Sequence, residues 1–266
     1  MNPVEEKMGR FQSGGLALEV YPNSRSMGVA AARGAAETMR QLASKHKQFS
    51  VIFATGASQL ETLDALTQIE GLPWGRVCGF HLDEYVDLPI EHPASFRAYL
   101  RRNLTQKVRM KEFYEIDGTA PDPNQTSCIY AEKLSSADPQ LCLLGIGENG
   151  HLAFMDPDVA DFNDPRKVKV VRLDNACREQ QVGEGWFETL EEVPESAISL
   201  TIPIMFRVPK LIVSVPGGRK AKIVRRALEE PISTNCPATI LRRHPDVTVY
   251  LDQDSAAELE GIIEMR

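Results

Sequence analysis

The sequence lacks the patterns that mark a disulfide framework or a zinc site. Its 266 residues include five cysteines, an odd number, and no two of them form a C-x-x-C pair. Scattered, unpaired cysteines are typical of reduced thiols in a cytoplasm. We therefore expect a cytoplasmic protein with no disulfide bonds and no metal site.

Long apolar runs and an excess of positive charge are also missing. The longest apolar runs, such as 211–216, are far shorter than the roughly 20 residues that a membrane-spanning helix needs. The formal net charge of -7 argues against non-specific binding of nucleic acid. This net charge does not exclude an anionic substrate, because a local site can be positive on an acidic protein. We expect neither a nucleic-acid partner nor a membrane partner.

The order of apolar segments indicates the fold class. Residues 1–14 are polar, without an apolar signal-peptide core, and are predicted to be a flexible leader, with a single domain over 15–266. Strand-like segments alternate with helix-like ones, which predicts βαβ units and a mostly parallel sheet. The expected strands are 16–21, 50–54, 76–82, a run from 141, 168–172, 198–202, 211–215 and 248–251. The expected helices are 25–47 with Ser24 as its cap, 58–69, 93–104, 125–134, 219–229 and 255–265.

The stretch 141–157 is the segment around which the rest is organised. A short apolar run, typical of a strand buried on both faces, breaks into three glycines with Glu, Asn, His and Asp among them. Glycine allows a positive φ and a close approach of the backbone to a ligand. In open parallel sheets ligands bind beyond the carboxyl ends of strands, so His151 and Asp156 lie where chemistry usually sits. The alternative is a turn whose histidine caps a helix or bonds a backbone carbonyl.

Two further junctions join a strand to a helix through glycine. They are Thr55-Gly56-Ala57-Ser58 and Gly217-Gly218-Arg219-Lys220. Free backbone N–H groups and the positive end of a helix dipole favour an anion at such junctions. A lysine in the first turn opposes that dipole, so Lys220 is unfavourably placed without an anionic partner. The alternatives are a plain turn, in which Ser58 and Glu61 form a capping box, and a solvated surface lysine.

Adjacent acids, Asp83 and Glu84, follow the strand predicted at 76–82. One interpretation is a helix cap and surface charges. The other is a catalytic base with a supporting neighbour, since a carboxylate in a dry site can remove a proton from the carbon next to a carbonyl.

Together and in this order, these segments resemble the glucosamine-6-phosphate deaminase/isomerase family, whose near neighbour is 6-phosphogluconolactonase. The resemblance covers roughly residues 16–260, and its two most specific segments, in combination, are Asp-Glu-Tyr-x-x-Leu-Pro and Gly-x-Asn-Gly-His. The matching segments are Thr55-Gly56-Ala57-Ser58, Leu82-Asp83-Glu84-Tyr85-Val86-Asp87-Leu88-Pro89, Glu91-His92-Pro93-Ala94-Ser95-Phe96, Gly145-Ile146-Gly147-Glu148-Asn149-Gly150-His151-Leu152-Ala153-Phe154, Gly217-Gly218-Arg219-Lys220-Ala221, Cys236-Pro237-Ala238-Thr239-Ile240-Leu241 and His244-Pro245. The Asp-Glu-Tyr segment favours the deaminase side.

The resemblance implies a Rossmann-like, three-layer α/β/α sandwich and a reaction without a cofactor. The ring of glucosamine 6-phosphate would open, the sugar would isomerise through an enediol-type intermediate, and hydrolysis would yield fructose 6-phosphate and ammonia. By the matched positions, Asp83 would move the C2 proton to C1. His151, assisted by Asn149 and Asp156, would open the ring. Thr55 to Ser58 and Lys220 would bind the phosphate, and the further candidate contacts are Glu84, Gly147 and Arg178.

Three departures from the family pattern keep other functions open. Asn149 stands where some members have Asp, and Asp156 is one methylene shorter than the usual Glu. The segment 174–187 lacks the expected phosphate-binding Arg, with Gly185 near its place and Arg178 as a substitute. The alternatives are a related 6-phosphosugar isomerase or lactonase, and a sugar-phosphate-binding regulator without turnover. The sequence is also compatible with a homo-oligomer.

Overall fold

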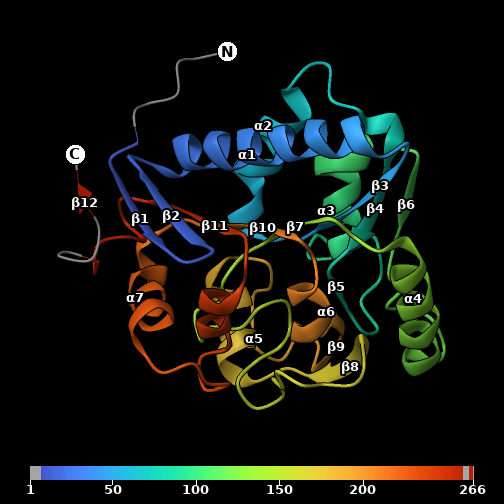
Figure 1. Ribbon diagram of the computed structural model, residues 1–266. Coiled ribbons are helices and arrows are strands. Elements are labelled where there is room, and N and C mark those ends of the chain that lie inside the picture. Colours follow the sequence, from blue (N-terminus) through green and yellow to red (C-terminus); the bar gives the residue numbers. More distant parts are fainter. Residues whose placement is uncertain (1–6, 260–263, 266) are drawn as a thin grey trace.

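A nine-stranded sheet forms the middle layer of the protein, whose computed structural model describes residues 7–259 and 264–265 (Figure 1). In spatial order its strands are β12 (Glu264–Met265), β1 (Gly9–Ser13), β2 (Leu16–Tyr21), β11 (Val247–Asp252), β10 (Lys210–Val215), β7 (Leu141–Leu144), β3 (Phe49–Phe53), β4 (Val77–His81) and β6 (Glu112–Tyr114). From β2 to β6 all neighbours run parallel. Only the β12–β1–β2 edge is antiparallel. The predicted mostly parallel sheet is confirmed.

Helices α1 (Ser24–Lys45) and α2 (Leu60–Gln68) cover one face of this sheet (Figure 1). The inner side of α1 is built from alanines with Met27 and Met39, all buried, so the helix lies close to the strands. The two helices also approach each other closely, because a Cβ on Gly28 would lie only 2.4 Å from the Cβ of Glu61. Small side chains therefore set the spacing of this layer.

The opposite face carries a second, three-stranded antiparallel sheet of β5 (Asp83–Tyr85), β9 (Ser196–Leu200) and β8 (Val168–Arg172). The helices of this layer are α4 (Pro123–Ala137), α5 (Asn175–Gly183), α6 (Ile202–Phe206) and α7 (Ala221–Glu229) (Figure 1). The short α3 (Phe96–Leu100) continues into a turn of π-helix over Arg101–Thr105. The three-layer α/β/α arrangement is confirmed. None of the helices in the described part of the chain is long and apolar enough to cross a bilayer.

Strand order brings four loops to one edge of the main sheet. Strands β10, β7, β3 and β4 are consecutive neighbours and run parallel, so all four end at the same edge. The segments that follow those ends contain, respectively, Lys220, His151, Ser58 and, as the first residue of β5, Asp83. These loops are far apart in the sequence, and the sheet alone makes them adjacent.

Both ends of the chain differ from the sequence-based predictions. Residues 9–13 of the predicted leader form β1, which pairs with β2 over its whole length; residues 1–6 lie outside the described part. The predicted closing helix over 255–265 is wrong, because residues 255–258 form turns and Glu264–Met265 pairs with β1. Pairing along the free edge of the sheet overrides a helical pattern of moderate propensity.

Two predicted helix caps also differ. Asn23, not Ser24, caps α1, and its Oδ1 accepts a hydrogen bond from the backbone N–H of Ser26 at 2.9 Å. The capping box of Ser58 and Glu61 does not form, because Ala57–Gln59 is a 3₁₀ turn and α2 begins only at Leu60. The Ser58 hydroxyl is therefore not used as the cap of α2.

Candidate active site

A cavity at the carboxyl edge of the sheet brings eight of the predicted site residues together. They are Thr55, Gly56, Ala57, Ser58, Asp83, Gly147, His151 and Lys220. Phe96 and Phe154, whose rings stack with centroids 5.7 Å apart, supply an apolar wall. Four other predicted residues, Asn149, Asp156, Glu84 and Arg178, are not among its lining residues.

The two glycine junctions adopt the same local geometry on either side of the cavity. Gly56 has φ 86° and Gly217 has φ 90°, values that glycine adopts at little cost. Each is followed by a 3₁₀ turn, over Ala57–Gln59 and Gly218–Lys220, that leads into α2 and α7. The arrangement turns two helix starts toward one cavity, which suits an anion.

Lys220 is the cation of this part of the cavity. The side chain is buried, and burial lowers the pKa of its ammonium group, while Glu184 and Glu148 act in the opposite direction. A buried ammonium is costly without an anionic partner. The position is therefore suited to a negatively charged ligand.

Asp83 is the first residue of β5 and is almost fully buried. Burial, and then the charge of Glu84, raise the pKa of its carboxyl group well above the usual range. A carboxylate with a raised pKa is a better proton acceptor than an ordinary one. Asp83 can therefore act as a base on a carbon acid held in the cavity.

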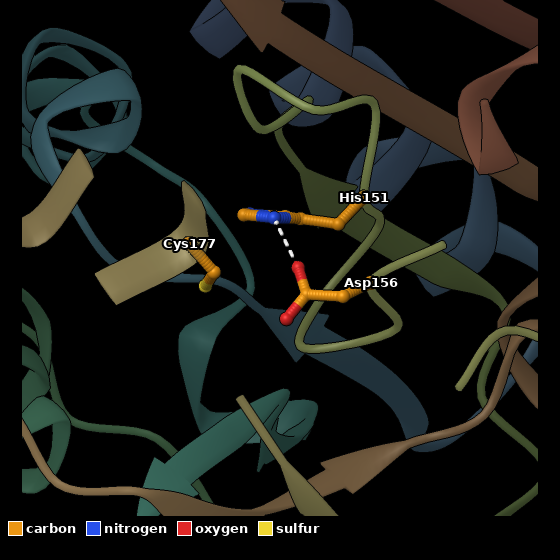
Figure 2. Close-up of side chains that lie close together, drawn as sticks. All are labelled: His151, Asp156 and Cys177. Carbon is orange, nitrogen blue, oxygen red and sulfur yellow. Dashed lines mark ion pairs between the residues drawn. The ribbon is translucent and has the colours of Figure 1, made fainter. Parts of the chain in front are cut away.

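His151 and Asp156 form a dyad from the loop after β7 (Figure 2). Nδ1 of His151 lies 2.9 Å from Oδ1 of Asp156. Asp156 also accepts hydrogen bonds from Asn149 Nδ2 at 2.9 Å and from the backbone N–H of Asp174 at 3.2 Å. Burial raises the pKa of Asp156, but the nearby His151 and the hydrogen bonds from Asn149 and the Asp174 backbone outweigh it and hold the pKa below its usual value. The carboxylate thus stays ionised next to Nδ1 of the ring.

The histidine ring is fixed by two residues of its own loop. A Cβ on Gly147 would lie 2.2 Å from the ring atoms Cε1 and Nε2, so only glycine fits under the ring. The backbone N–H of His151 donates to Oδ1 of Asn149 at 3.0 Å. Since Nδ1 is turned inward to Asp156, Nε2 is the ring nitrogen available to a ligand in the cavity.

Glu84 faces away from the cavity. It is fully buried, and its carboxylate accepts hydrogen bonds from the backbone N–H groups of Tyr85, Phe96 and Arg97 at 3.0, 3.1 and 2.8 Å. The Ser95 hydroxyl donates to it at 3.2 Å. Glu84 therefore holds the start of α3, and the interpretation of this acid as a helix cap is the one that the contacts favour.

Arg178 and Asn149 also have structural partners. The Arg178 guanidinium donates to the carbonyl groups of Leu190 at 2.6 Å and Val193 at 3.1 Å, so it braces a loop and does not replace the missing Arg in the cavity. Asn149 donates to Asp174 at 3.0 Å as well as to Asp156. Asn149 thus joins the His151 loop to the segment before α5.

Three lining residues near the end of α5 were missed by the sequence analysis. They are Gln180, Gln181 and Glu184. Gln180 accepts from the backbone N–H of Glu148 at 2.9 Å and donates to Glu184 at 2.7 Å. In the sequence these residues form a polar cluster directly before Gly185, which has a positive φ in the structure. Such a cluster at the end of a helix could have indicated them.

Among the described residues, one group has the chemistry of a metal site. The ligand atoms of His151, Asp156 and Cys177 lie within 4.8 Å of one another (Figure 2). The carboxylate of Asp156 is already engaged by His151, Asn149 and a backbone N–H group. Burial raises the pKa of the Cys177 thiol well above its usual value, which disfavours the thiolate that a metal needs. The absence of a metal stays a prediction.

The comparison with known proteins agrees with this geometry. Residues 22–250 match the family model described as glucosamine-6-phosphate isomerases/6-phosphogluconolactonase. A glucosamine-6-phosphate deaminase of Exiguobacterium sibiricum is 34% identical over 224 residues, which is 84% of this chain and 86% of the relative. One from Bacillus cereus is 36% identical over 203 residues, 76% of this chain and 75% of the relative.

Solved structures share the whole architecture. A monomeric glucosamine-6-phosphate deaminase matches with a TM-score of 0.83 and 27% identity, over 91% of this chain and 99% of that one. A 6-phosphogluconolactonase from Trypanosoma brucei, 18% identical, has the same fold with a TM-score of 0.76 over 94% of this chain and 99% of that one. The family model matches most of the chain, and relatives more than 30% identical cover most of its length. The chain therefore belongs to the glucosamine-6-phosphate isomerase/6-phosphogluconolactonase family.

Proposed function

We propose that the protein is a glucosamine-6-phosphate deaminase, which converts an amino-sugar 6-phosphate and water to fructose 6-phosphate and ammonia. The observation that carries the proposal is one cavity lined by a buried carboxylate, an imidazole and two glycine-entered helix starts with a lysine. The deaminase names of the relatives at 32–36% identity support it.

In this proposal the phosphate binds to the 55–58 loop and Lys220. Backbone N–H groups at the start of α2, the hydroxyls of Thr55 and Ser58, and the ammonium of Lys220 would hold its oxygens. This placement orients the sugar, so that its C1 and C2 face Asp83 and its ring oxygen faces His151.

Proton transfer is then divided between two groups. His151, kept in one orientation by Asp156 and Asn149, takes the proton of the C1 hydroxyl at Nε2 and passes it to the ring oxygen as the bond between C1 and that oxygen breaks, which opens the ring. Asp83 takes the C2 proton from the open-chain sugar and returns it to C1. Water then adds at C2 and ammonia departs. No cofactor is needed in this sequence of steps.

Release of ammonia from a panel of 2-amino-2-deoxyhexose 6-phosphates tests the proposal, with hydrolysis of 6-phosphogluconolactone measured alongside. Ammonia release that disappears in Asp83→Asn supports the deaminase. Lactone hydrolysis without ammonia release would favour the lactonase, which has no use for a carbon base. Binding without either reaction would favour a regulator.

A further inference from the structure

The cavity contains a second acid that the proposed reaction does not use. Glu184 lies just after α5, and its two carboxylate oxygens accept hydrogen bonds from Gln180 Nε2 at 2.7 Å and from Trp186 Nε1 at 3.2 Å. These two donors, on either side, hold the carboxylate in a defined position at the cavity wall.

A chain of contacts links Glu184 to the 55–58 loop, where the phosphate is proposed to bind. The ring of Trp186, which donates to Glu184, packs edge-on against Tyr99 with centroids 6.2 Å apart. The Tyr99 hydroxyl in turn donates to the carbonyl of Gly56 at 2.9 Å. Glu184 is thus joined through two aromatic residues to the loop that receives the phosphate.

The charge of Glu184 also acts on the phosphate-binding lysine. Of the charged groups that raise the Lys220 pKa against the effect of burial, Glu184 has the largest influence and Glu148 follows. Glu148 is compensated, because Arg219 Nε lies 2.9 Å from its carboxylate. Glu184 forms no ion pair within residues 7–259. Its negative charge is therefore not neutralised by an ion pair and can act on a ligand as well as on Lys220.

We propose that Glu184 is a specificity-determining residue that limits the affinity of the pocket for the phosphate group. The inference rests on the proposed function, in particular on the phosphate site at the 55–58 loop and Lys220. A fixed carboxylate repels a phosphate that carries up to two negative charges, and a partly buried pocket screens this repulsion only weakly. The attraction for the phosphate then comes from the neutral donors of the 55–58 loop and from Lys220. The enzyme would release a phosphorylated product readily and would distinguish phosphorylated from unphosphorylated sugars less sharply than the same pocket without this acid.

Titration of the full-length protein with inorganic phosphate in a calorimeter, at pH 7.5 and low salt, tests the inference. Glu184→Gln keeps the size and one acceptor of the side chain but removes its charge. We expect the Kd for phosphate to fall roughly tenfold in this variant, and the gain to shrink in high salt. Glu179→Gln is the matched control, because it removes the same charge from an exposed position on α5, and its Kd should stay within about twofold of the parent value.

A second measurement compares the binding of phosphorylated and unphosphorylated sugars. The ratio of the inhibition constant of unphosphorylated glucosamine to the KM of its 6-phosphate should rise roughly tenfold in Glu184→Gln. An unchanged Kd for phosphate, or a higher one, would overturn the inference, since a higher Kd would mean that the carboxylate accepts a hydrogen bond from the ligand. Ammonia release is measured separately. Its absence, with the expected change in Kd, would overturn the proposed deaminase and leave the role of Glu184 standing.

Discussion

Nδ1 of His151 lies 2.9 Å from Oδ1 of Asp156, within hydrogen-bond reach, although the acid is one methylene shorter than the glutamate usual in the family. The short loop between them explains how. Leu152 and Met155 form an isolated bridge that folds the chain back, so the Asp156 carboxylate returns to Nδ1 of the ring. Two further donors, from Asn149 and the backbone of Asp174, fix the carboxylate there. The shorter acid is compensated by the path of the backbone.

Asp156→Asn should therefore impair ring opening. The amide keeps the size of the side chain but loses the negative charge that lies next to Nδ1 of His151. We expect kcat/KM for the closed-ring substrate to fall about 100-fold, and that for an open-chain analogue to fall much less. Asp158→Asn, at an exposed position on the same loop, should leave both values unchanged. Equal losses with the two substrates would show that Asp156 supports the loop and not the proton transfer.

Asp83→Asn should abolish activity and stabilise the fold. Without the carboxylate, exchange of the C2 proton with solvent deuterium should stop. The folded-state pKa of Asp83 is raised above its unfolded value of about 3.9, so the native state binds the proton more tightly. Stability is therefore lost as pH rises from about 3.9 through the raised pKa, and the penalty is complete above it.

Removal of that penalty should raise the Tm of Asp83→Asn by roughly 2–5 °C at pH 8, with little difference from the parent near pH 3.5. Thermal unfolding at the two pH values measures this. Persistent deuterium exchange in the variant would exclude Asp83 as the carbon base. A lower Tm at pH 8 would contradict the stability argument.

Lys220→Ala should weaken binding of the phosphorylated substrate while the fold remains intact. Loss of a charge-assisted hydrogen bond of about 1.5–3 kcal/mol corresponds to an increase in KM of roughly 10- to 100-fold. Lys222→Ala, two residues later and exposed, is the control and should leave KM unchanged. Steady-state kinetics with the 6-phosphate checks both. An unchanged KM in Lys220→Ala would rule out this phosphate site.

Glu84→Gln should destabilise the protein. Three backbone N–H groups and a hydroxyl donate to the buried carboxylate. The amide would turn an NH₂ group toward some of these donors and leave them unsatisfied. We expect a loss of about 2–4 kcal/mol in the free energy of unfolding, measured by urea denaturation, with KM of the folded fraction unchanged. Glu91→Gln, which is exposed, should have no such effect. A normal stability with a raised KM would instead make Glu84 a substrate contact.

Local sequence patterns were sufficient to predict most of the elements of the sheet and the loops that carry the candidate site. The run Phe49–Phe53 is apolar except for Ser50 and is buried throughout, and such a run indicates a central strand before any contact is known. Glycine followed by a helix start at 56–60 and 217–221 likewise predicts where an anion can bind. These features depend on neighbours in the chain, which is why the sequence by itself determined them.

Only the tertiary structure decided which side chains enter the cavity. Asp83 and Glu84 are adjacent acids, but successive residues of a strand point to opposite faces, and pairing of β5 with β9 turns Asp83 to the cavity and Glu84 to α3. Gln180, Gln181 and Glu184 reach the cavity because α5 packs beside a loop from a distant strand. The pairing of β1 with β12 likewise depends on a contact between segments that are far apart in the sequence. Contacts between remote segments set these orientations, and no local pattern carries that information.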